Sequence, residues 1–222
     1  MHIDNLSLPA LLFALITLIS ATTFLLAIIL APWRALLSVQ TRQHAYLGGI
    51  ICLVVTWSMK IGWIPGLILH PLGITAFTVV FGWPLTIVAG FVALIANTVL
   101  THGQWSLISV DFLLTVLIPA TVTYGISRLV LSHASRNLFL FLLGIGFVGA
   151  ILGMLSSVLA LLLLAYFVDH AEYLHKLRNE FAVLAMLLYT EGFLNGMVVA
   201  AITVFAPDLV KTFDNRKYLR EK

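Results

Sequence analysis

The chain consists of long uncharged stretches of apolar residues separated by short polar breaks. A helix needs about 20 apolar residues to cross roughly 30 Å of hydrocarbon, and lipid offers no partner to unpaired backbone groups. We therefore interpret the stretches as membrane-spanning helices. The pattern predicts an all-α, polytopic bundle that forms one integral membrane domain over residues 1–222, with seven segments at about 8–31, 45–59, 71–82, 84–100, 109–130, 137–168 and 181–206.

Glycine and proline interrupt this pattern at two places. Residues 60–66 include Pro65 and Gly66, and Gly82 and Pro84 separate the third segment from the fourth. At 1.5 Å per residue the third segment is only about 18 Å long. We expect it to be tilted, buried among its neighbours or only partly crossing. The first segment lacks a basic n-region and is too long for the h-region of a signal peptide, so we expect it on the mature protein.

Composition and charge support a membrane protein and suggest its orientation. Apolar residues make up 61% of the chain and charged residues 9%, whereas a soluble domain has about 25% charged residues. This excludes a soluble enzyme, a nucleic-acid-binding protein and a disordered chain. With the N-terminus outside and the C-terminus inside, the inner loops and the basic tail at 207–222 hold nine Lys and Arg residues, and the outer loops hold three. The positive-inside rule favours this orientation.

The first two residues offer three nitrogens that can chelate a metal ion. A bulky second residue blocks removal of the initiator methionine, so His2 predicts that Met1 is retained. The α-amine, the His2 amide and the His2 imidazole can then form fused chelate rings around one ion. Such a nitrogen set favours square-planar Ni²⁺ or Cu²⁺ and can serve Co²⁺. The alternative is that His2 is simply the second residue of an exposed tail.

One histidine lies at the mouth of the short third segment. His70 follows the Pro65-Gly66 turn and precedes Pro71, on the same predicted outer side as the N-terminus. Ionisable residues at membrane depth are costly and usually functional. Irregular backbone at that depth is tolerated where it lines a cavity or is buried in protein. The alternative is a histidine at the membrane interface.

Several further polar residues are predicted within or near the apolar segments. Glu191 is the clearest intramembrane carboxylate, and Asn195, four residues on, shares its helical face. Asn97, His102 and Asp111 add polar groups to the outer half. The alternative role for these residues is interhelical hydrogen bonding, worth about 0.6 kcal/mol per bond.

The remaining candidates have simpler explanations. The single cysteine, Cys52, excludes an intrachain disulfide and a cysteine metal cluster. Gly144, Gly146, Gly149 and Gly153 lie inside an apolar helix with no preceding strand, which favours close helix packing over nucleotide binding. The His and acidic residues of 169–175 are expected in a solvated outer loop.

The N-terminal, His70 and Glu191 motifs occur together in one family. The chain resembles, over nearly its whole length, the CbiM/NikM-type substrate-binding membrane components of energy-coupling-factor cobalt and nickel ABC transporters. The likeness rests on Met1-His2-Ile3, on the Pro-Gly turn before His70, on Phe81-Gly82-Trp83-Pro84 and on Thr190-Glu191-Gly192. The family's N-terminal segment inserts among the other helices. Asp111 stands where the family has an asparagine.

The resemblance implies a ligand set, a substrate and partners. One ion would be held by the Met1 amine, the His2 amide, the His2 imidazole and His70, so that residues 1–7 form a metal-binding segment. The substrate would be Co²⁺ or Ni²⁺, and Cu²⁺ fits the same donors. A separate energy-coupling transmembrane protein and ATPase subunits would drive uptake across the inner membrane of a bacterium. The polar lining of the site would comprise Asn97, His102, Asp111, Glu191 and Asn195.

Two other functions compete with metal uptake. The chain has no Walker A motif, so partner proteins would have to hydrolyse ATP. Without such partners, the protein would be a stand-alone membrane metal-holding or delivery protein. A membrane enzyme using Glu191 and a histidine as acid and base is a third hypothesis. No nucleophile motif or HExxH motif supports it, and we expect no enzyme activity.

Overall fold

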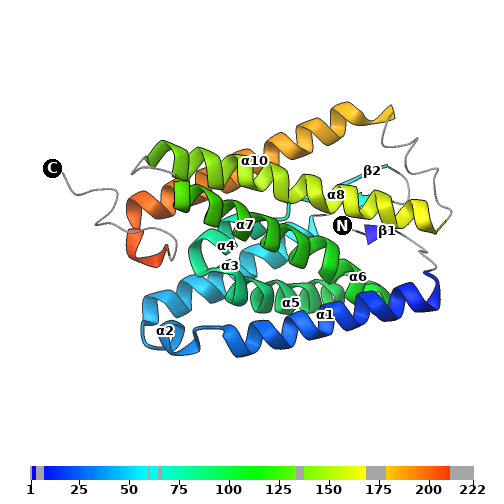
Figure 1. Cartoon of the computed structure of the whole chain (residues 1–222), viewed down its shortest axis with the longest axis horizontal. Coiled ribbons are helices and arrows are strands. Elements are labelled where there is room, and N and C mark those ends of the chain that lie inside the picture. The colour runs from blue at the N-terminus through cyan, green and yellow to red at the C-terminus, as the bar shows by residue number, and fades with distance from the viewer. Residues whose placement is uncertain are drawn as a thin grey trace.

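The fold was analysed in a computed structural model that describes residues 2–3, 8–59, 61–64, 67–133, 138–168 and 179–210. Helices dominate this part of the chain and run mainly along the long axis of the molecule (Figure 1). The main α-helices are α1 (Ala10–Leu30), α3 (Gln40–Ser58), α4 (Ile74–Phe81), α5 (Trp83–Leu100), α7 (Ile118–His133), α8 (Gly149–Phe167) and α10 (Phe181–Phe205). The other helical elements are the short α-helices α2 (Trp33–Leu37) and α6 (Ile108–Phe112), the 3-10 turns η1 (Trp105–Leu107) and η4 (Pro207–Leu209), and the π-helical stretches η2 (Leu113–Leu117) and η3 (Leu140–Val148).

The helical architecture expected from the apolar stretches is confirmed, and each of the seven stretches contains a helix. Within the described residues, five helical stretches are long and apolar enough to cross a membrane: Ala10–Leu30, Trp83–Leu100, Trp105–Ser132, Leu140–Phe167 and Phe181–Phe205. The second and third predicted segments, α3 and α4, are not among these five. The count of seven crossings and the orientation of the termini therefore stay predictions.

A small antiparallel sheet was not expected from the sequence. β2 (Ile61–Ile64) and β3 (Leu67–Leu69) form a hairpin with Ile61 opposite Leu69 and Ile64 opposite Leu67. β1 (His2–Ile3) pairs with the other edge of β3, giving the order β1-β3-β2. The described residues 61–64 of the predicted Gly/Pro break thus form a strand beside β3, which also pairs with the N-terminal strand.

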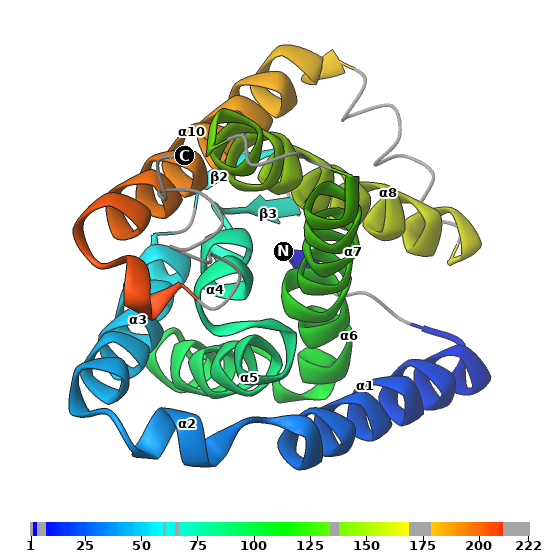
Figure 2. The same cartoon turned by 60° about the vertical axis from the view of Figure 1, so that its left-hand side comes forward.

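Helix α4 forms the centre of the bundle. All eight of its residues are buried, and it packs against α5, α7, α8 and α10. Figure 2 shows α4 enclosed by α3, α5, α7 and α10, with α1 at the periphery. The third segment, for which three placements were open, is therefore buried among its neighbours.

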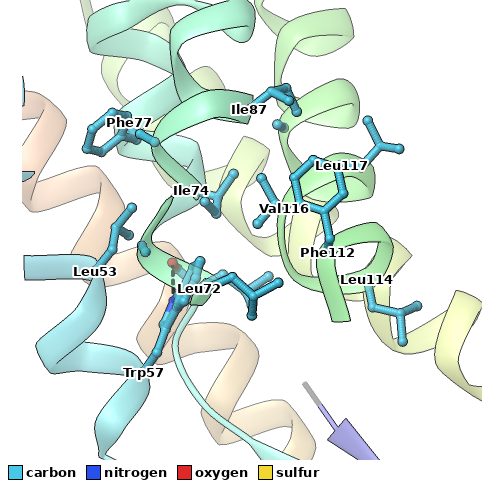
Figure 3. Packing of buried hydrophobic residues seen from close by; sticks show 14 of the residues in the cluster. Leu53, Trp57, Leu72, Ile74, Phe77, Ile87, Phe112, Leu114, Val116 and Leu117 are labelled. Atoms are coloured by element: carbon cyan, nitrogen blue, oxygen red, sulfur yellow. Dashed lines mark hydrogen bonds between the residues drawn. The ribbon is translucent and has the colours of Figure 1, made fainter. Parts of the chain in front are cut away.

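Glycine conformation sets both ends of α4. Gly73 has φ +69° and Gly82 has φ +83°, values that an L side chain adopts only with strain. Pro84 then lies in the first turn of α5, where its missing N–H costs nothing. Figure 3 shows Ile74 and Phe77 of α4 packed among Leu53 and Trp57 of α3 and Ile87 of α5. The turn that contains His70 therefore leads directly into the best-packed part of the core.

Small residues allow close packing of the last helices, as the glycine pattern predicted. A Cβ at Gly146 would lie 3.3 Å from the Cα of Gly196, and one at Gly153 would lie 3.5 Å from the Oγ1 of Thr123. A Cβ at Gly192 would likewise lie close to a neighbour, 2.8 Å from the Cγ1 atom of Ile151. These contacts pack η3 and α8 against α7 and α10, which fixes the position of Glu191 in the core.

Candidate metal-binding site

The four-residue turn at 70–73, here called the His70 turn, connects β3 to α4. His70 is buried, with 7% of its surface exposed. Its ring lies 5.8 Å from the ring of Trp57, centroid to centroid. Its Nδ1 is 3.2 Å from the carbonyl oxygen of Pro71. In the tautomer that carries hydrogen on Nδ1, this nitrogen donates to Pro71, and Nε2 has the lone pair that a cation needs.

Glu191 and Asn195 of α10 hold the His70 turn from one side. The Glu191 carboxylate accepts the backbone N–H of Leu72 at 2.8 Å and that of Gly73 at 2.9 Å. Asn195 accepts the N–H of Ala76 at 2.8 Å and donates to Glu191 Oε1 at 2.8 Å. The first turn of a helix leaves backbone N–H groups without helical partners. These two side chains bond such groups at the start of α4, which is why a short helix can begin inside an apolar bundle.

Trp57 of α3 holds the same turn through a second contact, to the carbonyl group of Leu72. Its Nε1 donates to the carbonyl oxygen of Leu72 at 2.9 Å, and its ring is 1% exposed. Leu72 therefore has its N–H bonded to α10 and its C=O bonded to α3. A backbone bonded on both sides has little freedom to move, so the position of His70 is determined by α3 and α10 together.

The N-terminal strand lies beside the segment that leads into His70. In the pairing of β1 with β3, His2 is opposite Ile68 and Ile3 is opposite Leu67. Residues directly opposite in antiparallel strands have Cα atoms about 4.5–5.5 Å apart. Because Ile68 precedes His70 by two residues, the backbone of His2 lies close to the His70 turn. Met1 and the side chain of His2 lie outside the described residues, so the ligand set stays a prediction.

A cavity opens next to the His70 turn, between α3, α4 and α10. Its volume is about 390 Å³, and Pro71, Gly73, Glu191 and Asn195 line it at the end near the turn. Most of the other lining is apolar and extends along the helices to Leu209. The cavity therefore places the Glu191 carboxylate and the His70 turn beside a single space that reaches the far end of the bundle.

The other predicted lining residues are placed differently. Asn97, in the last turn of α5, accepts a hydrogen bond from Ser58 at the end of α3 at 3.2 Å. His102 is exposed in the turn after α5, with φ +50°. Asp111 is half-buried in α6. A role for these three residues at the site stays a prediction. The acidic and histidine residues at 169–175 and the tail at 211–222 lie outside the described residues.

The described side chains do not form a conventional metal cluster. Among them, no three His, Cys, Asp or Glu residues gather into a group that could hold a metal ion. The predicted ligand set has two histidines and two main-chain nitrogens, so it would not form such a group.

Sequence reasoning missed Trp57 and the sheet. A signal for a turn was present, because Pro65-Gly66 separates two short apolar runs. No comparable signal identified Trp57, since an aromatic residue in an apolar helix is usually core.

Comparison with known families gives one match that covers most of the chain. The model of one family, described as a cobalt uptake substrate-specific transmembrane region (CbiM), matches residues 2–209. The chain belongs to the CbiM family. It is thus a membrane component of cobalt uptake, and CbiM is a family of transporter components rather than enzymes. The match includes β1, the His70 turn and Glu191. A comparison with curated proteins found no match.

Proposed function

We propose that the protein binds a divalent transition-metal ion at its outer face and passes it inward as the substrate-binding component of an energy-coupling-factor transporter. The pairing of β1 with β3 carries this proposal, because it puts the backbone of His2 beside the turn that holds the buried His70. His2 and His70, which are 68 positions apart in the sequence, would thereby be available to a single ion.

The chemistry of the proposed donors supports cobalt, nickel or copper as the substrate. The Met1 amine, the His2 amide and the His2 imidazole would supply three nitrogens in one plane, and His70 would supply the fourth. Nitrogen donors of this kind suit Ni²⁺, Co²⁺ and Cu²⁺, and copper is intrinsically the tightest binder. Selection of cobalt over copper would therefore depend on site geometry and on metal supply.

The distribution of basic residues supports the proposed orientation. Arg42, near the start of α3, donates to the carbonyl oxygen of Asp208 in η4 at 2.8 Å, so these two elements lie at the same end. α2 and the end of α7 lie at that end as well, opposite the sheet (Figure 1). We assign this end to the cytoplasm by the positive-inside rule. The energy-coupling protein and the ATPase subunits would dock there.

The proposal is tested by metal binding to purified protein with a native N-terminus and a C-terminal tag. Co²⁺ and Ni²⁺ are titrated separately into wild type, His70→Ala and His44→Ala. We expect one ion per wild-type chain, a loss of affinity of about 100-fold in His70→Ala, and no change in His44→Ala, because His44 is exposed near the start of α3, away from the His70 turn. Equal affinities in wild type and His70→Ala would contradict the proposal.

A further inference from the structure

Glu191 is an acidic residue in the middle of α10 and has 1% of its surface exposed. Its carboxylate oxygens accept three hydrogen bonds, from the N–H groups of Leu72 and Gly73 and from the amide of Asn195. An ionised carboxylate only accepts hydrogen bonds, whereas a protonated one must also donate. The surroundings of Glu191 therefore match the charged form.

A buried charge in an apolar bundle is costly unless another charge or several hydrogen bonds compensate it. The arginines whose side chains are described are Arg34 in α2, Arg42 in α3 and Arg128 in α7. α2, the start of α3 and the end of α7 lie at the end of the bundle opposite the sheet (Figure 1). Within the described residues, these arginines do not compensate Glu191.

The loaded metal site would carry the opposite charge. A divalent ion bound by one ionised backbone amide and neutral nitrogens has a net charge of about +1, and it would lie in the same buried region. Leu72, which Glu191 bonds, is two residues from His70, and two residues extend at most about 7 Å. With the 2.8 Å hydrogen bond, the length of the imidazole side chain and a metal–nitrogen bond of about 2 Å added, the carboxylate and the ion would be separated by roughly 15 Å or less.

We propose that Glu191 is the counter-charge of the loaded metal site and, through the backbone of Leu72 and Gly73, the residue that positions His70. This inference rests on the proposed function. The negative charge would favour the cation-loaded state over the empty one. At a separation of up to roughly 15 Å and an effective dielectric constant of about 20, the attraction would raise metal affinity about sixfold or more.

Two substitutions separate the charge from the hydrogen bonds. Glu191→Gln keeps the length of the side chain and one acceptor oxygen but removes the charge. Glu191→Asp keeps the charge but is too short to keep the present geometry of both bonds. If Glu191 acts as a counter-charge, Glu191→Asp retains more metal affinity than Glu191→Gln. If Glu191 only caps α4, Glu191→Gln retains more metal affinity than Glu191→Asp.

The experiment measures Ni²⁺ affinity and thermal unfolding for wild type, both Glu191 variants and Asn195→Ala. Asn195→Ala is the matched control, because it breaks bonds to Ala76 and Glu191 but leaves the charge. We expect Glu191→Gln to bind Ni²⁺ at least about sixfold more weakly than wild type, with Glu191→Asp and Asn195→Ala each losing less. The inference would be overturned if Glu191→Gln bound Ni²⁺ as tightly as wild type, or if it bound Ni²⁺ more tightly than Glu191→Asp.

A second measurement needs no variant and covers the case in which Glu191→Gln does not fold. Infrared spectra of wild-type protein labelled with ¹³C-glutamate distinguish a carboxylate from a protonated acid. We expect Glu191 to be a carboxylate at neutral pH with Ni²⁺ bound, and a buried protonated acid would overturn the inference. If wild-type protein with a native N-terminus fails to bind Ni²⁺, the proposed function itself is contradicted.

Discussion

The two parts of the proposed site are built in different ways. The His70 turn is bonded to α3 through Trp57 and to α10 through Glu191, and it leads into a helix whose residues are all buried. The N-terminal strand, in contrast, is a two-residue segment that pairs with β3 through its backbone. A two-stranded pairing is marginally stable by itself even when it is several residues long.

This difference suggests a division of labour between the two parts. The fold supplies His70 in a defined position before any ion arrives. The N-terminal residues supply three of the four proposed donors, and the ion would stabilise their attachment to the bundle. Disturbing the N-terminus should therefore affect metal binding and leave the fold intact, whereas disturbing the His70 turn should affect both.

The largest effect is expected from blocking the N-terminal amine. Adding two residues before Met1 converts the amine into an amide and removes a donor from the chelate. Because losing an outer-shell partner already costs about 10–100-fold in metal affinity, losing a donor should cost about 100-fold or more. Titration calorimetry with Ni²⁺ measures the loss, and the same two residues at the C-terminus are the control. An unchanged thermal unfolding temperature without metal would show that the fold is unaffected.

A methyl group added at Gly49 should disturb the packing of α3 against α4, whereas one added at its neighbour Gly48 should not. A Cβ at Gly49 would lie 2.5 Å from Phe77 of α4, whereas at Gly48 no atom lies within 4 Å. Phe77 also packs against Tyr46 and Phe81, so its ring has little room to move. Gly49→Ala should destabilise the protein by about 2 kcal/mol through overpacking. Gly48→Ala should be neutral or stabilising by up to about 1 kcal/mol. Chemical unfolding in detergent would measure both, and equal stabilities would contradict this packing.

Metal binding should weaken as the pH falls. The proposed donors are an amine and two imidazoles, groups that can take up protons when no metal ion is bound. Protons then compete with the ion, so Ni²⁺ affinity should fall about tenfold or more between pH 7 and pH 6 and recover when the pH is raised. Equilibrium dialysis at each pH measures this change. Affinity that is constant over this range would exclude a site made of these donors.

The smallest effect is expected from the bond on the α3 side of the His70 turn. Trp57→Phe keeps an aromatic ring beside His70 but loses the hydrogen bond to Leu72. A single hydrogen bond contributes about 1 kcal/mol, so Ni²⁺ affinity should drop about fivefold. Trp83→Phe is the matched control, because Trp83 Nε1 bonds Thr121 instead, at 3.1 Å. Equal affinities in the two variants would show that α3 does not position His70.

Much of the fold could be predicted because, in a membrane chain, the length of each apolar stretch and the positions of Gly and Pro indicate where helices begin and end. The first predicted segment, 8–31, corresponds to Ala10–Leu30, and the last, 181–206, to Phe181–Phe205. The sheet was missed because its strands are two to four residues long, too short for a periodicity to develop.

The site was harder to predict because it depends on contacts between distant residues. The spacing of Glu191 and Asn195 predicted a shared helical face, and the structure has them bonded to each other. Their partners are backbone N–H groups of Leu72, Gly73 and Ala76, which carry no signal in the sequence. Similarly, the pairing of His2 with Ile68 is a main-chain contact. Its proximity to His70 followed from the family resemblance, and no property of those residue types indicates it.

The central claim is that one ion is bound by the first two residues together with His70. Electron paramagnetic resonance of Cu²⁺-loaded protein with a native N-terminus tests it most directly, because nitrogen couplings count the nitrogens in the copper plane. We predict four equatorial nitrogens in wild type and three in His70→Ala. An identical nitrogen pattern in the two proteins would contradict the account.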